Sequence, residues 1–91
     1  MKLDIQHLPD HGRFQAVVDG HTCITDYRLA GGVMSITHTE VASALEGRGI
    51  AGALMRAALE HARAAGLKVR PLCSYARTYM QRHPESAALL A

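Results

Sequence analysis

The first forty residues contain short segments in which hydrophobic and polar residues alternate, separated by glycine-bearing turns. Alternation with a period of two predicts strands, because successive side chains of a strand point to opposite faces. Three strands are expected, over residues 13–18, 21–29 and 33–41, with turns at 9–12, at Asp19-Gly20 and at Gly31-Gly32. An Asp-Gly pair between two strands favours a type I′ hairpin, in which both central residues have positive φ. The first half of the chain therefore predicts an antiparallel meander.

The third of these strands has a histidine among its apolar residues. Under strict alternation, Met34, Ile36 and His38 fall on one face of segment 33–41, and the Ser and Thr residues between them fall on the other. We therefore expect the His38 side chain to point in the same direction as the apolar side chains.

Beyond Gly49 the hydrophobic period lengthens to three and four residues, which predicts a helix of about four turns. Its apolar stripe comprises Ile50, Leu54, Ala57, Ala58, His61 and Ala65, widened by Met55 and Leu59. Gly66 is expected to end it, because glycine readily adopts the left-handed cap conformation. Residues 67–75 alternate again and predict a strand, in which Pro71 marks an edge or an interrupted pairing. A short helix over roughly 75–82 is expected next, stopped by Pro84.

A strand, a helix and a further strand in succession predict a right-handed βαβ unit with parallel strands. The expected fold class is therefore α+β, with an antiparallel meander leading into a βαβ unit and a short C-terminal helix. Ligands gather at the carboxyl ends of parallel strands in such folds. His38, Glu40, the glycine-rich start of the helix and Cys73 all fall at or near these ends.

The size and composition of the chain limit the possibilities further. With 91 residues, 48% of them hydrophobic, one domain over residues 1–91 is expected. Cys23 and Cys73 lack metal-type spacing, so a reduced, cytoplasmic protein is the simplest interpretation, and a disulfide between them is left open. The sequence has no secretory signal or membrane-spanning run, and no membrane partner is expected. We expect a monomer or a weak homo-oligomer.

Charge is distributed unevenly along the chain. Residues 1–46 carry three basic and six acidic side chains, a net charge of −3, whereas residues 47–91 carry seven basic and two acidic, a net charge of +5. A basic half suits an anionic ligand such as a phosphate-bearing cofactor, a nucleic acid or an acidic surface. Aromatic residues make up only 4% of the chain, which disfavours nucleic-acid binding because few side chains are available to stack on bases.

Three glycines, Gly47, Gly49 and Gly52, surround the start of the predicted helix. Each lowers helix stability, yet the absence of a Cβ lets a ligand approach the backbone. The first N–H groups of a helix have no partner within it and bind phosphate well. Segment 45–52 is therefore predicted to bind a diphosphate, and the alternative interpretation is a plain flexible loop.

The order of these elements resembles the GNAT superfamily of acetyl-CoA-dependent N-acetyltransferases. The signature of that superfamily is Gln or Arg, two residues, Gly, one residue, then Gly or Ala. The segment EGRGIA matches it at Gly49 and Ala51 but has Glu46 in the first position. More specifically, HTEV, LEGRGIAGALM and KVRPLCSYARTYMQRHPE resemble a subfamily of minimal single-domain GNAT-like acetyltransferases, over residues 16–85.

The resemblance implies a compact GNAT-like fold that binds acetyl-CoA. It implies that the diphosphate lies on the loop and helix start, at Arg48, Gly49, Ile50, Ala51 and Gly52. It implies that the pantetheine arm pairs, like an added strand, with Thr39, Glu40 and Val41. Residues of the last helix would reach the pantetheine or adenosine end, namely Tyr75, Arg77 and Tyr79. Glu46 replaces the usual side-chain donor to the phosphates, which leaves the backbone and Arg48 to bind them.

Acetyl transfer from a thioester to an amine requires a neutral amine, a donor to the carbonyl oxygen and a proton for the leaving thiolate. Histidine is the natural base near neutral pH, which points to His38, and Glu40 would orient it or take the proton through water. Cys73 would protonate the thiolate or take the acetyl group itself. On residue type alone, a structural cysteine and a core histidine are simple alternatives.

Two functions follow from this pattern. The first is an acetyl-CoA-dependent N-acetyltransferase that moves the acetyl group to an amine of a protein, a peptide or a small molecule. The second is a non-catalytic acyl-CoA-binding or protein-interaction module, suggested by a chain too small to enclose an acceptor.

Overall fold

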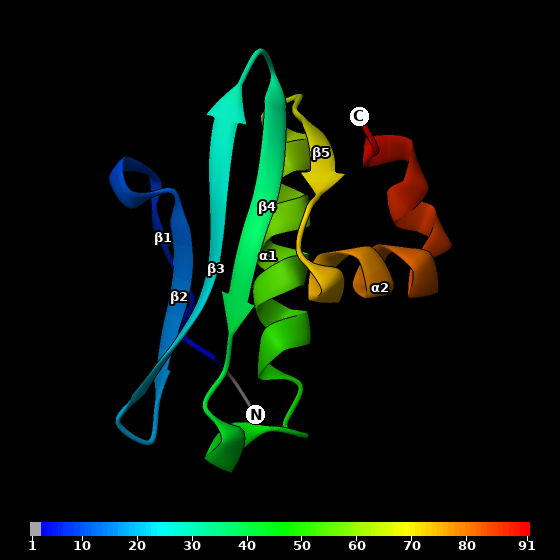
Figure 1. Ribbon diagram of the computed structural model, residues 1–91. Coiled ribbons are helices and arrows are strands. Elements are labelled where there is room, and N and C mark those ends of the chain that lie inside the picture. Colours follow the sequence, from blue (N-terminus) through cyan, green and yellow to red (C-terminus); the bar gives the residue numbers. More distant parts are fainter. Residues whose placement is uncertain (1–2) are drawn as a thin grey trace.

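The computed structural model describes residues 3–91, which form one five-stranded sheet and two α-helices (Figure 1). The strands lie in the order β1-β2-β3-β4-β5, with the bounds β1 Gln6–Leu8, β2 Arg13–Val18, β3 His21–Ala30, β4 Val33–Glu40 and β5 Lys68–Pro71. Helix α1 (Ile50–Ala64) connects β4 to β5, and α2 (Ser74–Arg82) follows β5. Short 3₁₀ turns occupy Pro9–His11, Ser43–Leu45 and Pro84–Leu89. None of the helices in residues 3–91 is long and apolar enough to cross a membrane.

The meander and the parallel unit are confirmed. Strands β1 to β4 pair antiparallel in succession, and β4 pairs with β5 in parallel. Both residues of the β2–β3 turn have positive φ, 50° at Asp19 and 78° at Gly20, as a type I′ turn requires. Strand β1 was not expected from the pattern, because its three residues are too few for alternation to show.

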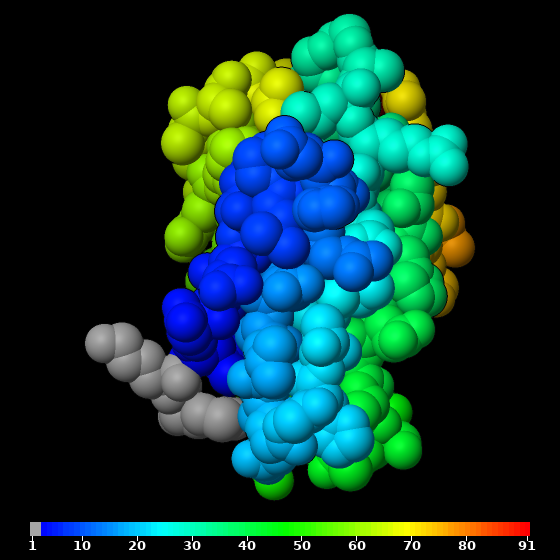
Figure 2. Space-filling model, turned by 90° about the vertical axis from the view of Figure 1, so that its left-hand side faces the viewer, coloured from blue at the N-terminus to red at the C-terminus, as the bar shows by residue number. Residues whose placement is uncertain are grey.

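Helix α1 lies across one face of the sheet and forms the core with it. Most of the predicted apolar stripe is buried and packs on the sheet residues Phe14, Ala16, Tyr27, Met34, Ile36 and Val69. Ala57 and His61 are only partly buried, Ala65 is exposed beyond the end of the helix, and Ala62 is buried although it was not predicted. The helix ends just before Gly66, whose φ of +71° is the expected left-handed conformation. In Figure 2, which views the molecule from the β1 side, α1 (yellow-green) lies on only one side of the sheet. In Figure 1 neither helix lies in front of β2 to β4, so the opposite face of the sheet is open there.

An irregularity in β4 reverses the predicted direction of His38. Tyr27 lies opposite Ile36, but Asp26 lies opposite His38, so Thr37 is an extra residue in β4. The alternation shifts by one at this bulge, which brings Thr39 rather than His38 to the core face. Accordingly, the His38 side chain is 54% exposed on the open face. The expectation that His38 points with Met34 and Ile36 is therefore wrong.

Strand β5 is shorter than predicted and separates from β4 before β4 ends. Its last paired residue is Pro71, opposite Ile36. The backbone N–H groups of Leu72 and Cys73 both donate to the Ile36 carbonyl, at 3.0 and 3.1 Å. Cys73 therefore begins a helix instead of continuing a strand, contrary to the predicted strand over 67–75. Among the described residues 3–91, none pairs as a strand with residues 37–40 of β4 on the β5 side.

Candidate active site

The glycine-rich loop ends at a helix start that has no side-chain cap. Gly49, the residue before α1, has a φ of +80°, and Gly47 has a φ of +84°. A Cβ built at either position would meet no other atom within 4 Å, so both are needed for backbone conformation and not for packing. The first N–H groups of α1 are thus available to an anion, as the glycine pattern predicts.

A groove of about 560 Å³ opens at this helix start, and we refer to it as the first groove. Eight of the predicted cofactor-binding residues line it, from β4, the loop, α1 and α2, namely Thr39, Glu40, Val41, Gly49, Ile50, Ala51, Gly52 and Tyr75. The groove runs from the end of β4 that lacks a strand partner to the start of α1. Sequence reasoning thus identified residues that the fold brings together from four separate segments.

The three remaining predicted residues lie elsewhere. Arg48 forms an ion pair with Asp19 of the β2–β3 turn, with 2.9 Å between Nη1 and Oδ2. Arg77 donates to the carbonyl oxygen of Leu72 at 2.6 Å, beside the end of β5. Tyr79 lines a second groove of about 470 Å³, which shares Gly49, Gly52 and Tyr75 with the first.

Gly52 is in regular helical conformation, unlike the two loop glycines. A Cβ at Gly52 would lie 3.7 Å from the hydroxyl oxygen of Tyr75 and 3.8 Å from Cε2 of Tyr79, which is ordinary contact. The fold therefore tolerates alanine here, and glycine leaves extra room between α1 and α2. Burial raises the pKa of the Tyr75 phenol, Tyr79 raises it further, and the charge of Arg82 opposes both.

Cys73 caps α2 on the helix side of the sheet. Its sulfur accepts the backbone N–H of Ala76 at 3.4 Å and lies 3.9 Å from Oγ1 of Thr39. The Thr39 hydroxyl is in turn 3.3 Å from that of buried Thr25. Cys73 is thus half-buried beside a strand residue that lines the first groove.

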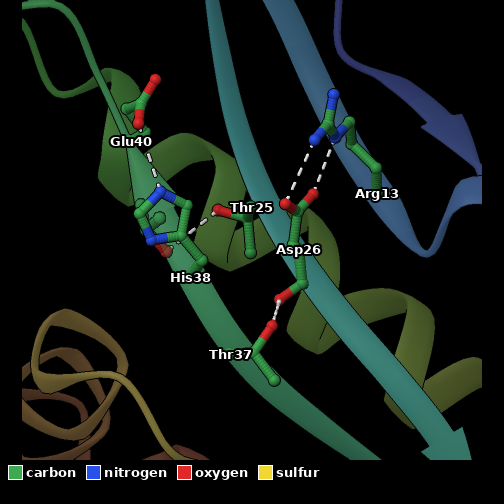
Figure 3. A network of polar contacts seen from close by, with 7 residues as sticks. Arg13, Thr25, Asp26, Thr37, His38 and Glu40 are labelled. Carbon is green, nitrogen blue, oxygen red and sulfur yellow. Dashed lines mark hydrogen bonds and ion pairs between the residues drawn. The ribbon is translucent and has the colours of Figure 1, made fainter.

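His38 lies on the other face of the sheet and contacts Glu40 (Figure 3). Its Nε2 is 3.2 Å from Oε1 of Glu40, and Glu40 itself lines the first groove. Nearby, Arg13 forms a two-pronged ion pair with Asp26 of β3, at 2.7 and 3.2 Å. The sheet therefore separates His38 from Cys73, and the two flank the open end of β4 from opposite faces.

Two arginines that line the second groove, Arg56 and Arg82, were not predicted as site residues. Their spacing in the sequence could have identified them. Arg56 follows Gly52 by four residues and Arg82 follows Tyr75 by seven, so each lies on the groove face of its helix.

The comparisons with known proteins agree with this geometry. The family model of the GCN5-related N-acetyltransferases matches residues 13–89, from β2 to the last 3₁₀ turn. Among solved structures, a GCN5-like protein of Staphylococcus aureus, determined in solution by NMR, is similar with a TM-score of 0.80 at 26% sequence identity. The match covers 98% of this chain and 88% of that one. The predicted resemblance and fold class are confirmed, and the chain belongs to the GCN5-related N-acetyltransferase family.

Proposed function

We propose that the protein is an acetyl-CoA-dependent N-acetyltransferase whose cofactor lies in the first groove. The supporting observation is that an uncapped, glycine-rich helix start and a strand end without a partner line one groove. The backbone N–H groups of residues 50–52 bind the diphosphate there. Residues 39–41, at the end of β4 and directly after it, bind the extended pantetheine arm through their backbone, as an added strand would.

The side chains around the open end of β4 then perform the proton transfers. Acetyl-CoA, when bound, supplies the acetyl group as a reactive thioester. His38, held by Glu40, takes the proton that the attacking amine loses as its nitrogen bonds to the acetyl carbon. The C–S bond breaks, and Cys73 holds a proton at Sγ for the leaving thiolate. Because no helix covers the face that carries His38, the acceptor amine approaches over that face.

The second candidate function is a module that binds acyl-CoA without turnover. The separation of His38 and Cys73 across the sheet favours it, since both were expected to serve one reaction at neighbouring strand ends. Both functions share the cofactor site, so catalysis must be measured separately from binding.

Calorimetry with coenzyme A, followed by mass spectrometry of peptides and small amines incubated with acetyl-CoA, tests the proposal. We expect submillimolar binding and acetylated product, with turnover lost in His38→Gln and Cys73→Ser while binding is retained. His11→Gln is the matched control, because His11 is exposed on the turn before β2. Binding without product on any amine would favour the module, and no binding at millimolar coenzyme A would refute both.

A further inference from the structure

The second groove extends the cofactor site between α1 and α2. The two grooves meet at Gly49, Gly52 and Tyr75, so a ligand whose diphosphate lies at Gly49 has the first groove on one side and the second on the other. If the pantetheine arm follows β4 as proposed, the nucleotide end of coenzyme A falls in the second groove. What lines that groove therefore decides which nucleotide it accepts.

Two positive charges lie in this groove, one on each helix. Arg56 of α1 and Arg82 of α2 both line it and both are exposed. Within residues 3–91 the ion pairs of arginine are Arg13 with Asp26 and Arg48 with Asp19, so neither Arg56 nor Arg82 has a carboxylate within ion-pair distance. Two acidic residues, Glu60 and Glu85, line a neighbouring groove with Arg56 and not the second groove. Arg82 is also close enough to Tyr75 for its charge to act on the phenol. Two unpaired guanidinium groups facing one cavity attract a doubly charged anion more than a base or a sugar hydroxyl.

The rest of the groove suits a flat ring. The rings of Tyr79 and His83 stack with centroids 3.9 Å apart and an angle of 15° between planes, and the Tyr75 ring is 6.3 Å from that of Tyr79. His83 is fixed by a hydrogen bond between Nδ1 and the Tyr79 carbonyl oxygen, at 2.7 Å. An aromatic wall next to two guanidinium groups matches a purine nucleotide that carries a phosphate.

We propose that Arg56 and Arg82 make the protein select a cofactor with a phosphate on its ribose, the 3′-phosphate of coenzyme A. This inference rests on the proposed function, since it assumes that the diphosphate lies at Gly49. Both arginines are exposed, so the preference is moderate and weakens as salt screens it. Binding through the diphosphate and pantetheine is independent of them.

Calorimetric titration of the full chain with coenzyme A and with 3′-dephospho-coenzyme A tests the inference, because these ligands differ only in that phosphate. We expect the wild type to bind coenzyme A about tenfold more tightly, the scale of one or two charge-assisted hydrogen bonds at an exposed site. In the double variant Arg56→Gln, Arg82→Gln we expect the two affinities to become nearly equal, because only the binding of coenzyme A is weakened. Arg28→Gln, an exposed arginine of β3, is the matched control and keeps the wild-type ratio.

Three outcomes overturn the inference. Equal affinity of the wild type for both ligands shows that the ribose phosphate is not recognised, while the proposed function stands. Equal weakening of both ligands in the double variant shows that the arginines act on the diphosphate instead. Failure of both ligands to bind overturns the inference and the proposed function together.

Discussion

The sulfur of Cys73 lies 3.9 Å from the hydroxyl oxygen of Thr39, at the place where β4 has lost its partner β5. The same sulfur caps α2 by accepting the N–H of Ala76. The Cys73 sulfur thus both caps α2 and lies beside the proposed reaction site. If removal of this sulfur abolishes activity, the cause is either the loss of the helix cap or the loss of the thiol proton. Two substitutions distinguish these causes.

Cys73→Ala removes both the cap and the thiol, whereas Cys73→Ser keeps a capping oxygen. We expect the alanine variant to lose about 1 kcal/mol of unfolding free energy and the serine variant to lose little, as measured by urea denaturation. Turnover should fall in both if the thiol supplies a proton. A serine variant with full stability and full turnover would restrict Cys73 to its structural role.

Gly52→Ala should stabilise the fold and weaken cofactor binding at once. Alanine is favoured over glycine in a helix interior by about 1 kcal/mol, and its Cβ fits beside Tyr75 and Tyr79. The same Cβ occupies the floor shared by the two grooves, so we expect about tenfold weaker binding of coenzyme A, or about 1.4 kcal/mol. Thermal denaturation and calorimetry measure the two effects.

Gly66→Ala is the control for Gly52→Ala, because it should lower stability where Gly52→Ala raises it. Its φ of +71° strains any side chain, so stability should fall by about 1 kcal/mol while coenzyme A binding stays unchanged. If Gly52→Ala binds coenzyme A as tightly as the wild type, the cofactor does not lie between α1 and α2.

The ion pair of Arg48 with Asp19 competes with the diphosphate contact that the sequence resemblance predicts for Arg48. Asp19→Asn releases Arg48, and asparagine tolerates the positive φ of this turn position. An exposed pair contributes up to about 1 kcal/mol, so we expect up to about fivefold tighter binding of coenzyme A at low salt, by calorimetry. Asp10→Asn changes the net charge equally at an exposed turn and should have no such effect. Equal effects of the two variants would exclude a contact between Arg48 and the diphosphate.

His7 should make stability depend on pH. Its ring stacks on Phe14, contacts His61 edge-on and forms a hydrogen bond with the Tyr27 hydroxyl. Burial, and secondarily the charge of His61, lowers the pKa of His7 below its unfolded value of 6.5. The unfolded chain then binds the proton more readily, so the contribution of His7 is complete above pH 6.5 and is lost as pH falls below it.

Urea denaturation between pH 5 and 8 measures this dependence, with pH values set around the ordinary histidine range of about 6.5. We expect His7→Gln to be less stable at neutral pH but to lose less stability on acidification. His11→Gln, which changes an exposed histidine, should keep the wild-type slope. An unchanged slope in His7→Gln would assign the acid sensitivity to other groups.

The elements were predictable from sequence because their signals are local. The hydrophobic period and the turn glycines lie within the strands, helices and turns that they predict, and the basic stretch after Gly47 lies next to the predicted anion site. The bulge at Thr37 is different: alternation from Met34 to His38 is unbroken, and only the pairing with β3 creates the extra residue. The direction of His38 therefore depends on a neighbouring strand that the local pattern does not contain.

The site shows the same division between local and long-range information. The helix start at Gly49 could be predicted, because glycines cluster where the hydrophobic period changes, but its positive φ was not predicted. The partner of Arg48 could not, because Asp19 is far away in sequence. Cys73 fell within the predicted strand because the alternation of 67–75 continues through it. Cysteine is not among the preferred capping residues, so its type did not indicate a helix start.

The short outer strands protect the sheet from joining other sheets. β1 has three residues, and β5 has four, whose outer side is met by the chain end through a bridge from Val69 to Leu90 and a hydrogen bond from the Ala91 N–H to the Val69 carbonyl. Neither offers a long template to a foreign strand, a common route to aggregation. Within residues 3–91, the stretch of β4 without a strand partner instead lines the first groove, where an extended ligand can pair with it.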